Sequence, residues 1–570
     1  MRAQLELANT GLIAQQVAAT PFVDEVRGLV AEFAEATEDT VRAVLDEAAR
    51  FAVEYLEPLN EEGDRLGCRM EGGRVKTVAS HGPAWRAFAE GGWLSIDLPR
   101  HSGGQNLPQF LVMAVQEVMD RSCTAFGMMP VPVRSAARLI AAFAPGDVQA
   151  EWLPRLCSGE WSTTICISEA EAGSDVPRLR TRAEPGEDGL WRITGEKQWI
   201  SFGDQDLTSR IGHCLLARTE GAKGLSLFLV PDHFDGEPNG VAVRRIEHKL
   251  GLNTSPTCVM GFEGAKGYLL GEEGRGLAQM FVMIAIMRTA VGVQGIAAAS
   301  GAFDLAFGYA QQRRQGGRGA VPDLICQHAD VQRMLMGMAA RTDVLRAFGL
   351  TVAAMTDISR SSPDAGRRAR FDAMVQWMLP MFKTIGGETG FEVASEAIQI
   401  FGGAGYTREW PVEQILRDNR VLTIFEGASG IQALDILHRR LWRDGGKGQA
   451  LFLEMARTDA AEGLAAAHEG LDETYGLLEQ AARDLMALQE AGAFAAEAGA
   501  TAFLHLSGLA VMGWAAARMA LIAGDDPASR RLRASGNWFL TGIAGRAEAL
   551  AAEIRNGAAA VELFSELGAQ

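Results

Sequence analysis

The periodicity of apolar residues changes along this chain, and the changes limit the folds that it can adopt. From about Val23 to Glu160, segments such as TVRAVLDEAARFAVEYL carry apolar residues at helical spacing. From about Trp161 to Glu272, short segments rich in branched residues (WRITG, CLLAR, LSLFLV, VAVRRI) alternate with turn residues, as in an antiparallel all-β module. Helical spacing returns from Gly276 to Trp442 and resumes after a linker at 443–449. The sequence therefore predicts a mostly helical α+β protein with helices on both sides of one β module.

Length and charge define the class further. We expect four domains within the 570 residues: an N-terminal helical domain (1–160), a β domain (161–275), a second helical domain (276–442) and a helical extension (450–570). An apolar content of 48% is enough for large cores. The net charge of -17 disfavours non-specific attraction to nucleic acid or to anionic membranes.

The cysteines, the histidines and the apolar stretches bear on the compartment, on metal binding and on membrane spans. The seven cysteines are scattered without CxxC spacing, which indicates a reducing compartment without a disulfide framework or a zinc site. The nine histidines include no HExxH pair, so no metal site is expected. The first residues lack the apolar core of a signal peptide, and the apolar stretch from Phe503 to Gly524 contains His505 and Arg518, so it is interpreted as a buried helix. We expect a cytoplasmic protein without a membrane span.

A single acid, Glu426, lies between an apolar run and a glycine in the segment LTIFEGASG. Apolar cover raises the pKa of a glutamate above its ordinary value of about 4.3 and makes it a stronger base. A structural turn acid at the end of a buried segment is an equally open interpretation. Glu426 is thus a candidate general base.

Two polar clusters fall in the expected β module. The segment TICISEAEAGSD (164–175) runs from a strand into a Gly-Ser-Asp turn, whose amides and hydroxyls suit a flat polar ring or a phosphate oxygen; an ordinary hairpin is the alternative. The segment KQWISFGDQD (197–206) places Trp199 and Ser201 on one strand face. That pair suits an isoalloxazine ring, although a tryptophan on a strand is more often part of a core.

A third cluster, YAQQRRQGGRG (309–319), ends an expected helix. Arg313 and Arg314 there either offset the helix dipole or clamp a diphosphate. Without further context the first interpretation is the simpler one.

Six motifs stand in an order that resembles the acyl-CoA dehydrogenase family: CISEAEAGSD, KQWISFGD, KLGLNTSPTCVM, YAQQRRQG, IQIFGGAGYTREWPVEQILRD and FEGASGIQ. The resemblance covers roughly residues 40–441. The run SPTCVMGFEGAKGYLLGEEGRGL and the long tail after Lys447 are similar to the large bacterial branch with a C-terminal helical extension, which includes 3-methylmercaptopropionyl-CoA dehydrogenase.

The resemblance implies a fold, a cofactor and a reaction. The expected fold is an N-terminal helical domain, a central antiparallel β-barrel-like domain and a C-terminal four-helix bundle with an additional helical extension. The expected cofactor is FAD, and the expected reaction is the α,β-dehydrogenation of an acyl-CoA thioester to the trans-2-enoyl-CoA. Glu426 then matches the base that takes the α-proton while the β-hydride passes to flavin N5. The backbone N–H of Glu426 matches a donor to the thioester carbonyl, an effect worth about 3 kcal/mol per donor.

The resemblance also assigns the other site residues. Cofactor contacts are implied for Cys166, Ile167, Ser168, Ser174, Trp199, Ser201, Arg313, Gln399, Gly402, Gly403 and Ala428. Substrate contacts are implied for Ser174, Arg288, Glu426 and Gly427. Met287 occupies the position from which some relatives draw their base, so the chain offers one candidate base.

Four positions depart from the family pattern. Phe425 stands for the usual Tyr, Ala428 for Thr, Ala170 for Pro and Gln312 for Glu. Each change removes polarity or stiffness, and Ala428 removes a common FAD hydrogen bond. We therefore expect weaker cofactor binding than is usual in the family, with the chemistry retained.

Partners follow from the resemblance as well. An electron-transfer flavoprotein is the expected acceptor, within fatty acid β-oxidation, and the extension predicts a homodimer because it would cover the second interface of a tetramer. The alternatives are an acyl-CoA oxidase that uses O2, a DNA-associated flavoprotein on the same fold, and a protein that keeps the fold without activity. The acidic tail argues against nucleic-acid binding, and intact Glu426 and Arg288 argue against loss of activity.

Overall fold

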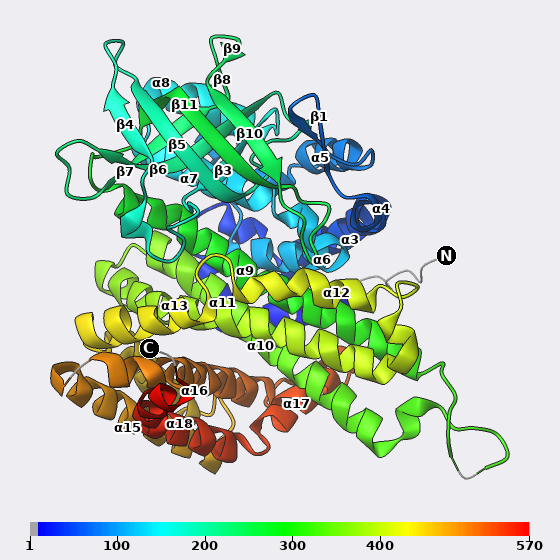
Figure 1. The fold of residues 1–570 in the computed structure, drawn as a ribbon. Coiled ribbons are helices and arrows are strands. Elements are labelled where there is room, and N and C mark those ends of the chain that lie inside the picture. Colours follow the sequence, from blue (N-terminus) through cyan, green and yellow to red (C-terminus); the bar gives the residue numbers. More distant parts are fainter. Residues whose placement is uncertain (1–8, 318, 492, 569–570) are drawn as a thin grey trace. The chain divides into compact units, whose positions relative to one another are not determined.

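The computed structural model describes residues 9–317, 319–491 and 493–568, which divide into two compact units. We call Glu47–Leu107 with Ser122–Ala290 the β unit, and Met1–Asp46 with Pro108–Arg121 and Val291–Gln570 the helical unit. Three helices contribute residues to both units: α3 (Glu38–Phe51), α6 (Gln109–Gly127) and α9 (Gly276–Ala310) (Figure 1). The division into four sequence domains stays a prediction.

The β unit is built around one sheet. Its strands are β3 (Trp161–Cys166), β4 (Arg182–Pro185), β5 (Trp191–Ser201), β6 (Arg210–Thr219), β7 (Leu225–Pro231), β10 (Val241–Ile246) and β11 (Thr257–Leu269). They are ordered β10-β11-β5-β4-β6-β3, and β7 pairs with both β11 and β6. The pairings of β11, β5, β4, β6 and β7 thus close a ring. The ring is uneven because β4 and β6 share only the register pairs Arg182↔Arg218 and Ala183↔Thr219.

Most pairings in the sheet are antiparallel, as expected, but β6 pairs in parallel with β3 and with β4. Parallel neighbours need a long crossover, and the chain between β3 and β6 provides one because it forms β4 and β5 on the way. The barrel interior holds a continuous apolar cluster that includes Ile193, Leu215, Phe228 and Phe262. The predicted fold class, mostly helical α+β with a β domain between helical regions, is confirmed.

Short helices accompany the barrel within the β unit. They are α4 (Glu57–Leu66), α5 (His81–Glu90), α7 (Pro130–Phe143) and α8 (Gly146–Cys157), with a small hairpin of β1 (Arg69–Glu71) and β2 (Arg74–Lys76) and another of β8 (His233–Phe234) and β9 (Glu237–Pro238). Helices α7 and α8 pack on β3, where Trp152 and Trp161 stack edge to face with ring centroids 4.7 Å apart. This packing fixes the strand that ends at Cys166.

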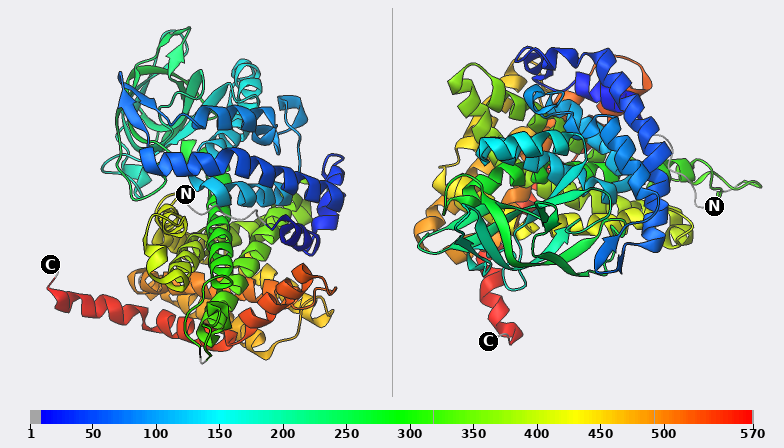
Figure 2. Two further views of the ribbon diagram at one scale, coloured as in Figure 1. Left: turned by 90° about the vertical axis from the view of Figure 1, so that its right-hand side faces the viewer. Right: turned by 90° about the horizontal axis from the view of Figure 1, so that it is seen from above.

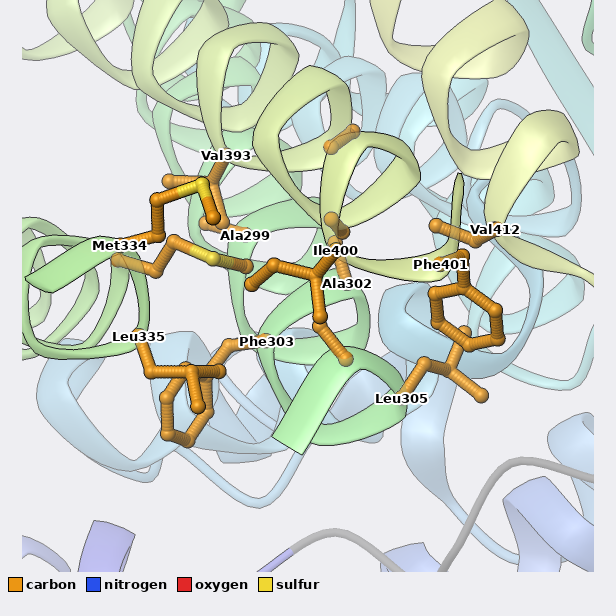
Figure 3. Close-up of a cluster of buried hydrophobic side chains, with 14 of the residues drawn as sticks. Ala299, Ala302, Phe303, Leu305, Met334, Leu335, Val393, Ile400, Phe401 and Val412 are labelled. Atoms are coloured by element: carbon orange, nitrogen blue, oxygen red, sulfur yellow. The ribbon is translucent and has the colours of Figure 1, made fainter. Parts of the chain in front are cut away.

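The helical unit is held by long, largely buried helices. Beside the second half of α9 lie α10 (Ala329–Ser361) and α11 (Ala365–Phe401), followed by α12 (Val412–Asn419) and α13 (Ser429–Leu434). One core cluster joins α9, α10, α11 and α12 through Phe303, Met334, Ile400 and Val412, which are labelled in Figure 3. Helices α9 and α11 cross very closely at Gly295, where a Cβ atom would lie 2.0 Å from the carbonyl oxygen of Gly386. Glycine is required there by the approach of the two backbones.

The C-terminal extension belongs to the helical unit. It consists of α14 (Lys447–Ala461), α15 (Glu469–Ala491), α16 (Ala493–Met519), α17 (Pro527–Leu540) and α18 (Ile543–Phe564), coloured orange to red in Figure 1. The last turns of α18 stand away from the other helices of this unit in both views of Figure 2, and Leu563 and Phe564 are exposed there. Helices α16 and α17 pack on α10, and α14 packs on α11.

A buried ion network ties the extension to α10. Asp343 accepts hydrogen bonds from Arg346, Arg531 and Ser535, and Arg346 also binds Glu117 at 2.7 Å. Burial alone would raise the pKa of Asp343, but Arg531 and Arg346 hold it below its ordinary value. Two acids and two arginines therefore balance their charges inside the protein.

Two described helices are long and apolar enough to cross a membrane, Gly276–Ala310 and Phe494–Met519. Their most apolar windows are 72% and 89% buried inside the protein. The second agrees with the expectation of a buried helix in the late apolar stretch.

Candidate active site

The predicted site residues fall into two groups, one in each unit. The β unit contains Cys166, Ile167, Ser168, Ser174, Trp199, Ser201 and Arg288. The helical unit contains Arg313, Gln399, Gly402, Gly403, Glu426, Gly427 and Ala428.

In the β unit, the end of β3 and the middle of β5 are brought together. The carbonyl oxygen of Ser168 accepts a hydrogen bond of 2.9 Å from the Gln198 N–H. The neighbouring carbonyl of Ile167 accepts a bond of 3.0 Å from the Lys197 ammonium. The segment 166–168 therefore lies beside Trp199 and Ser201, as the resemblance implies for two strands that share a ligand.

A buried ion pair that sequence reasoning missed holds this junction. Fully buried Lys197 lies 2.9 Å from Oε1 of Glu169, which also accepts bonds from Thr181 and from the Arg180 N–H. Burial lowers the pKa of Lys197 and would raise that of Glu169, but Lys197 and the other donors bring the pKa of Glu169 below its ordinary value. The carboxylate is thus charged and stabilises the ammonium beside it. The signal available in the sequence was a lysine inside a strand that otherwise buries apolar residues.

Trp199 lies on β5 but outside the barrel core. The register between β5 and β11 shows a bulge at this position. Ile200 pairs with Cys258 and Lys197 with Met260, so Gln198 and Trp199 together oppose Val259. Trp199 has a φ of 65°, in the left-handed region that disfavours large side chains, and it is 57% exposed. The bulge turns a large aromatic side chain out of the sheet while Lys197 and Ile200 stay buried.

This group fits a flavin ring. The exposed indole of Trp199 offers an aromatic face, and Ser168 and Ser201, which are partly exposed, offer hydroxyl groups on the same two chain segments. Ser174 is exposed in the turn that follows β3. Cys166, by contrast, is buried with its thiol in the barrel, where burial raises its pKa to about 12, so only its backbone is suited to a ligand contact.

In the helical unit, Glu426 and Gly427 form a left-handed turn between the helical turn Arg420–Thr423 and α13. Their φ values are 55° and 90°. A left-handed conformation at a residue other than glycine costs on the order of 1 to 3 kcal/mol and persists only where the surroundings enforce it. The Glu426 side chain is partly exposed.

Two buried donors enforce this turn. The Lys383 ammonium on α11 donates to the carbonyl oxygen of Gly427 at 2.8 Å, and Lys383 is fully buried. The amide of Gln432 on α13 donates to the carbonyl of Glu426 at 2.9 Å and to that of Gly427 at 3.3 Å. The carbonyls of Glu426 and Gly427 are thus fixed by the side chains of Lys383 and Gln432. Sequence reasoning did not single out these two residues, which lie 43 and 6 positions from Glu426.

The position before α13 is occupied by Ala428, one of the four departures from the family pattern. Ala428 is the N-cap residue of α13, and no side-chain hydrogen bond caps this helix. A hydroxyl side chain would satisfy one of the first helical N–H groups. Lys383 and Gln432 supply polar contacts to this turn instead.

The remaining residues of the helical unit are exposed. Arg313 lies just after α9, and Gln399, Gly402 and Gly403 lie where α11 ends. No atom lies within 4 Å of a Cβ added to Gly402 or Gly403, so the backbone is open to a ligand there. An exposed guanidinium and open glycine backbone fit the diphosphate and adenosine parts of FAD.

Arg288 and Met287 lie in the first half of α9, within the β unit, and both are buried. The Arg288 guanidinium carbon is 5.9 Å from the centre of the Phe281 ring. Among the described residues, no group of three or more His, Cys, Asp or Glu side chains could hold a metal ion, and the seven cysteines are free.

Family models match along the chain. Three describe the N-terminal, middle and C-terminal domains of acyl-CoA dehydrogenases, at residues 38–160, 164–265 and 274–441. A fourth, described as acetyl-CoA dehydrogenase C-terminal like, matches residues 451–564.

Two curated relatives match over most of their length. The 3-methylmercaptopropionyl-CoA dehydrogenase of Ruegeria pomeroyi is 38% identical over an alignment of 507 residues, and the match covers 85% of this chain and 86% of the relative. The broad-specificity linear acyl-CoA dehydrogenase FadE5 of Mycobacterium tuberculosis is 33% identical over an alignment of 541 residues, and the match covers 86% of this chain and 86% of the relative.

Solved structures share the fold. A Bacillus anthracis acyl-CoA dehydrogenase complexed with FAD superposes with a TM-score of 0.74 at 21% identity, covering 91% of this chain and 88% of that one. The Caenorhabditis elegans protein ACDH-11 gives a TM-score of 0.76 at 20% identity, covering 94% and 92%. Together these matches confirm the predicted family, enzyme class and cofactor: the chain belongs to the acyl-CoA dehydrogenase family of FAD-dependent oxidoreductases.

Proposed function

We propose that this enzyme converts an acyl-CoA thioester to the trans-2-enoyl-CoA, with Glu426 as the base that takes the α-proton. The observation that carries the proposal is the left-handed turn at Glu426, whose backbone is fixed by Lys383 and Gln432. Strained residues that the surroundings enforce cluster at active sites. A carboxylate on such a turn keeps one position relative to its substrate, as proton transfer requires.

The other predicted residues bind and orient FAD and the acyl-CoA. Ile167, Ser168, Trp199 and Ser201 hold the flavin ring, and Arg313, Gln399, Gly402 and Gly403 hold the diphosphate and adenosine parts. FAD, when bound, supplies the acceptor for the β-hydride. Arg288, Ser174 and the backbone of Gly427 contact the acyl-CoA. Cys166 and Ala428 contribute backbone contacts, because the thiol of Cys166 is buried and Ala428 has no polar side chain.

Acyl-CoA as the substrate class is supported by the relatives, which are named for 3-methylmercaptopropionyl-CoA and for linear acyl-CoA. An electron-transfer flavoprotein is the proposed acceptor, in the cytoplasm and within fatty acid β-oxidation. The acceptor is tested by mixing the reduced enzyme with an electron-transfer flavoprotein and, separately, with O2. Faster reoxidation by O2 would instead identify an oxidase.

The reaction is tested by anaerobic mixing of the purified holoenzyme with short, branched, thioether-containing and long acyl-CoAs while the flavin absorbance is followed. We expect at least one acyl-CoA to bleach the flavin within the mixing experiment and to yield the enoyl-CoA. A protein that binds no flavin, or a flavin that no acyl-CoA bleaches, would contradict the proposal.

We also propose a homodimer in which the extension takes the place of a second subunit interface. Light scattering in dilute solution tests this assembly. A mass of four chains would contradict it.

A further inference from the structure

The helical segment that follows the base lies along the C-terminal extension. Helix α13 continues without interruption into the π-helical turns Asp435–Arg443, and both parts contact α16 of the extension (Figure 1). The segment thus joins the left-handed turn at Glu426 to a part of the chain that lies more than sixty positions later.

A histidine of α16 reaches the start of α13 through one carboxylate. His505 Nε2 lies 2.7 Å from Oε2 of Glu388, a residue of α11. The other oxygen of Glu388 accepts a hydrogen bond of 3.0 Å from the hydroxyl of Ser429, the first residue of α13. Glu388 therefore links the extension to a residue three positions after the base.

The geometry of α13 carries this link to Glu426. Ser429 and Gln432 share the first turn of α13, and Gln432 donates to the carbonyl oxygen of Glu426 at 2.9 Å. Ala428 gives α13 no side-chain cap, and the Ser429–Glu388 bond holds the start of this helix. A shift of α13 would move the amide that holds the strained turn.

The surroundings of His505 favour its charged form. Burial alone would lower the pKa of His505, but the hydrogen bond to Glu388 and the charges of Glu388, Glu392 and Glu553 raise it above its ordinary value. Glu388 and Glu392 lie on α11 and Glu553 on α18, so acids on two helices face the imidazole.

A second pair provides an internal control. His438, on the same helical segment as α13, lies 2.9 Å from Glu497 of α16. The side chains of His438 and Glu497 are 38% and 34% exposed, which is close to the 31% and 29% for His505 and Glu388. The His438 pair joins the segment after α13 directly to α16, whereas the His505 pair joins α16 to α11 and reaches the turn at Glu426 through Ser429.

We propose that His505 is a positioning residue for Glu426 that acts through Glu388 and Ser429, so that the C-terminal extension supports the chemistry directly. The inference rests on the proposed role of Glu426 as the base. It assigns the extension a role in the reaction that is separate from any role in assembly.

The test compares His505→Leu with His438→Leu in the FAD-loaded, full-length enzyme. For His505→Leu we expect the rate of flavin bleaching at saturating acyl-CoA to fall about tenfold, which corresponds to about 1.4 kcal/mol in the barrier, with the acyl-CoA Kd within about twofold. The kinetic isotope effect with α-deuterated acyl-CoA should rise, because misplacement of the base slows proton abstraction itself. For His438→Leu we expect bleaching within about twofold of the wild type at a similar loss of Tm.

Conservative variants separate positioning from folding. His505→Gln keeps a donor to Glu388 and should recover most of the bleaching rate. Ser429→Ala removes the same link at its other end, and we expect the same loss of bleaching rate. This variant replaces His505→Leu in the test if His505→Leu cannot be purified.

The pH profile gives a further readout. Since the pKa of His505 is raised, the ion pair is complete below the ordinary histidine pKa of about 6.5 and is lost as the pH rises through the raised value. The wild-type bleaching rate should therefore decline on the alkaline side of that raised pKa, but not below the rate of His505→Gln, which keeps an uncharged donor and should lack this decline.

Equal bleaching rates in His505→Leu and His438→Leu, or a slow His505→Leu that His505→Gln does not rescue, would overturn the inference. Failure of the underlying function gives a different result. In that case Glu426→Gln, measured in the same way, would still bleach its flavin, whatever the His505 variants do.

Discussion

The barrel junction and the base turn use the same device with different partners. In each, a fully buried lysine donates to a backbone carbonyl: Lys197 to Ile167 at 3.0 Å and Lys383 to Gly427 at 2.8 Å. In each, a residue other than glycine is held at positive φ nearby: Trp199 at 65° and Glu426 at 55°. A buried ammonium can thus hold either a strand bulge or a helical turn in a strained conformation.

The partners of the two lysines differ. Lys197 forms an ion pair with Glu169, which is itself bound by Thr181 and Arg180. At the base turn, Gln432 donates to the carbonyls of Glu426 and Gly427, and it shares only that of Gly427 with Lys383. Loss of one charge from a buried pair is more costly than loss of one of two donors to a carbonyl, because the remaining charge is left in the interior. The barrel junction should therefore be the more sensitive of the two regions.

The largest effect is expected for Lys197→Met. The substitution leaves Glu169 without its countercharge and should lower the free energy of unfolding of the β unit by about 4 kcal/mol. Chemical denaturation followed by tryptophan fluorescence measures the loss. The double variant with Glu169→Gln should recover part of the stability, and equal stability of the single and double variants would contradict the ion-pair account.

Acidification should also weaken the β unit first. Burial lowers the pKa of His81 to about 3 and that of His213 to about 4, and both histidines belong to this unit. The unfolded chain therefore binds their protons first, and stability is lost as the pH falls from about 6.5 toward these values. At pH 5.5 the two histidines together should lower the free energy of unfolding of the β unit by about 3 kcal/mol.

Hydrogen exchange at pH 7 and pH 5.5 measures this difference, after correction for the intrinsic exchange rates. Protection in β3 and β6 should fall more than protection in α10. The variant His213→Gln should reduce the fall in β6, and an equal fall in both units would contradict the assignment.

A smaller effect is expected for Lys383→Met. The carbonyl of Gly427 keeps a contact with Gln432 at 3.3 Å, so the free energy of unfolding should drop by about 2 kcal/mol. The bleaching rate should drop more than the stability suggests, because the base turn loosens. Lys447→Met, at the exposed first residue of α14, is the matched control and should leave both the stability and the bleaching rate unchanged.

The smallest effect concerns the strain itself. Glu426→Gly and Glu426→Ala both remove the carboxylate, but only glycine adopts a φ of 55° without strain. The free energy of unfolding of Glu426→Gly should therefore be about 1 kcal/mol higher than that of Glu426→Ala. Equal Tm values would show that the turn stores no strain.

The sequence predicted the order of the elements because apolar periodicity is a local property. The change from helical spacing to alternating strands near Trp161 and the return near Gly276 both correspond to the structure. Glu426 could be singled out in the same way, since its apolar neighbours and the following glycine are adjacent to it.

Other features could not be predicted because they depend on contacts between distant positions. The parallel pairing of β3 with β6 follows from the course of the chain through β4 and β5. The bulge at Trp199 follows from its register with Val259, and the roles of Lys197 and Lys383 follow from partners 28 and 44 positions away. The link from His505 through Glu388 to Ser429 likewise connects three helices that no local pattern joins.

The most direct test of the account is the anaerobic bleaching rate of Glu426→Gln, compared with that of Glu409→Gln. Glu409 is an exposed acid in the same stretch of sequence and serves as the control. Glu426→Gln should bind FAD and acyl-CoA as the wild type does but bleach its flavin slower by about 10³-fold or more, whereas Glu409→Gln should match the wild type. Bleaching by Glu426→Gln within about tenfold of the wild-type rate would contradict the assignment of Glu426 as the base.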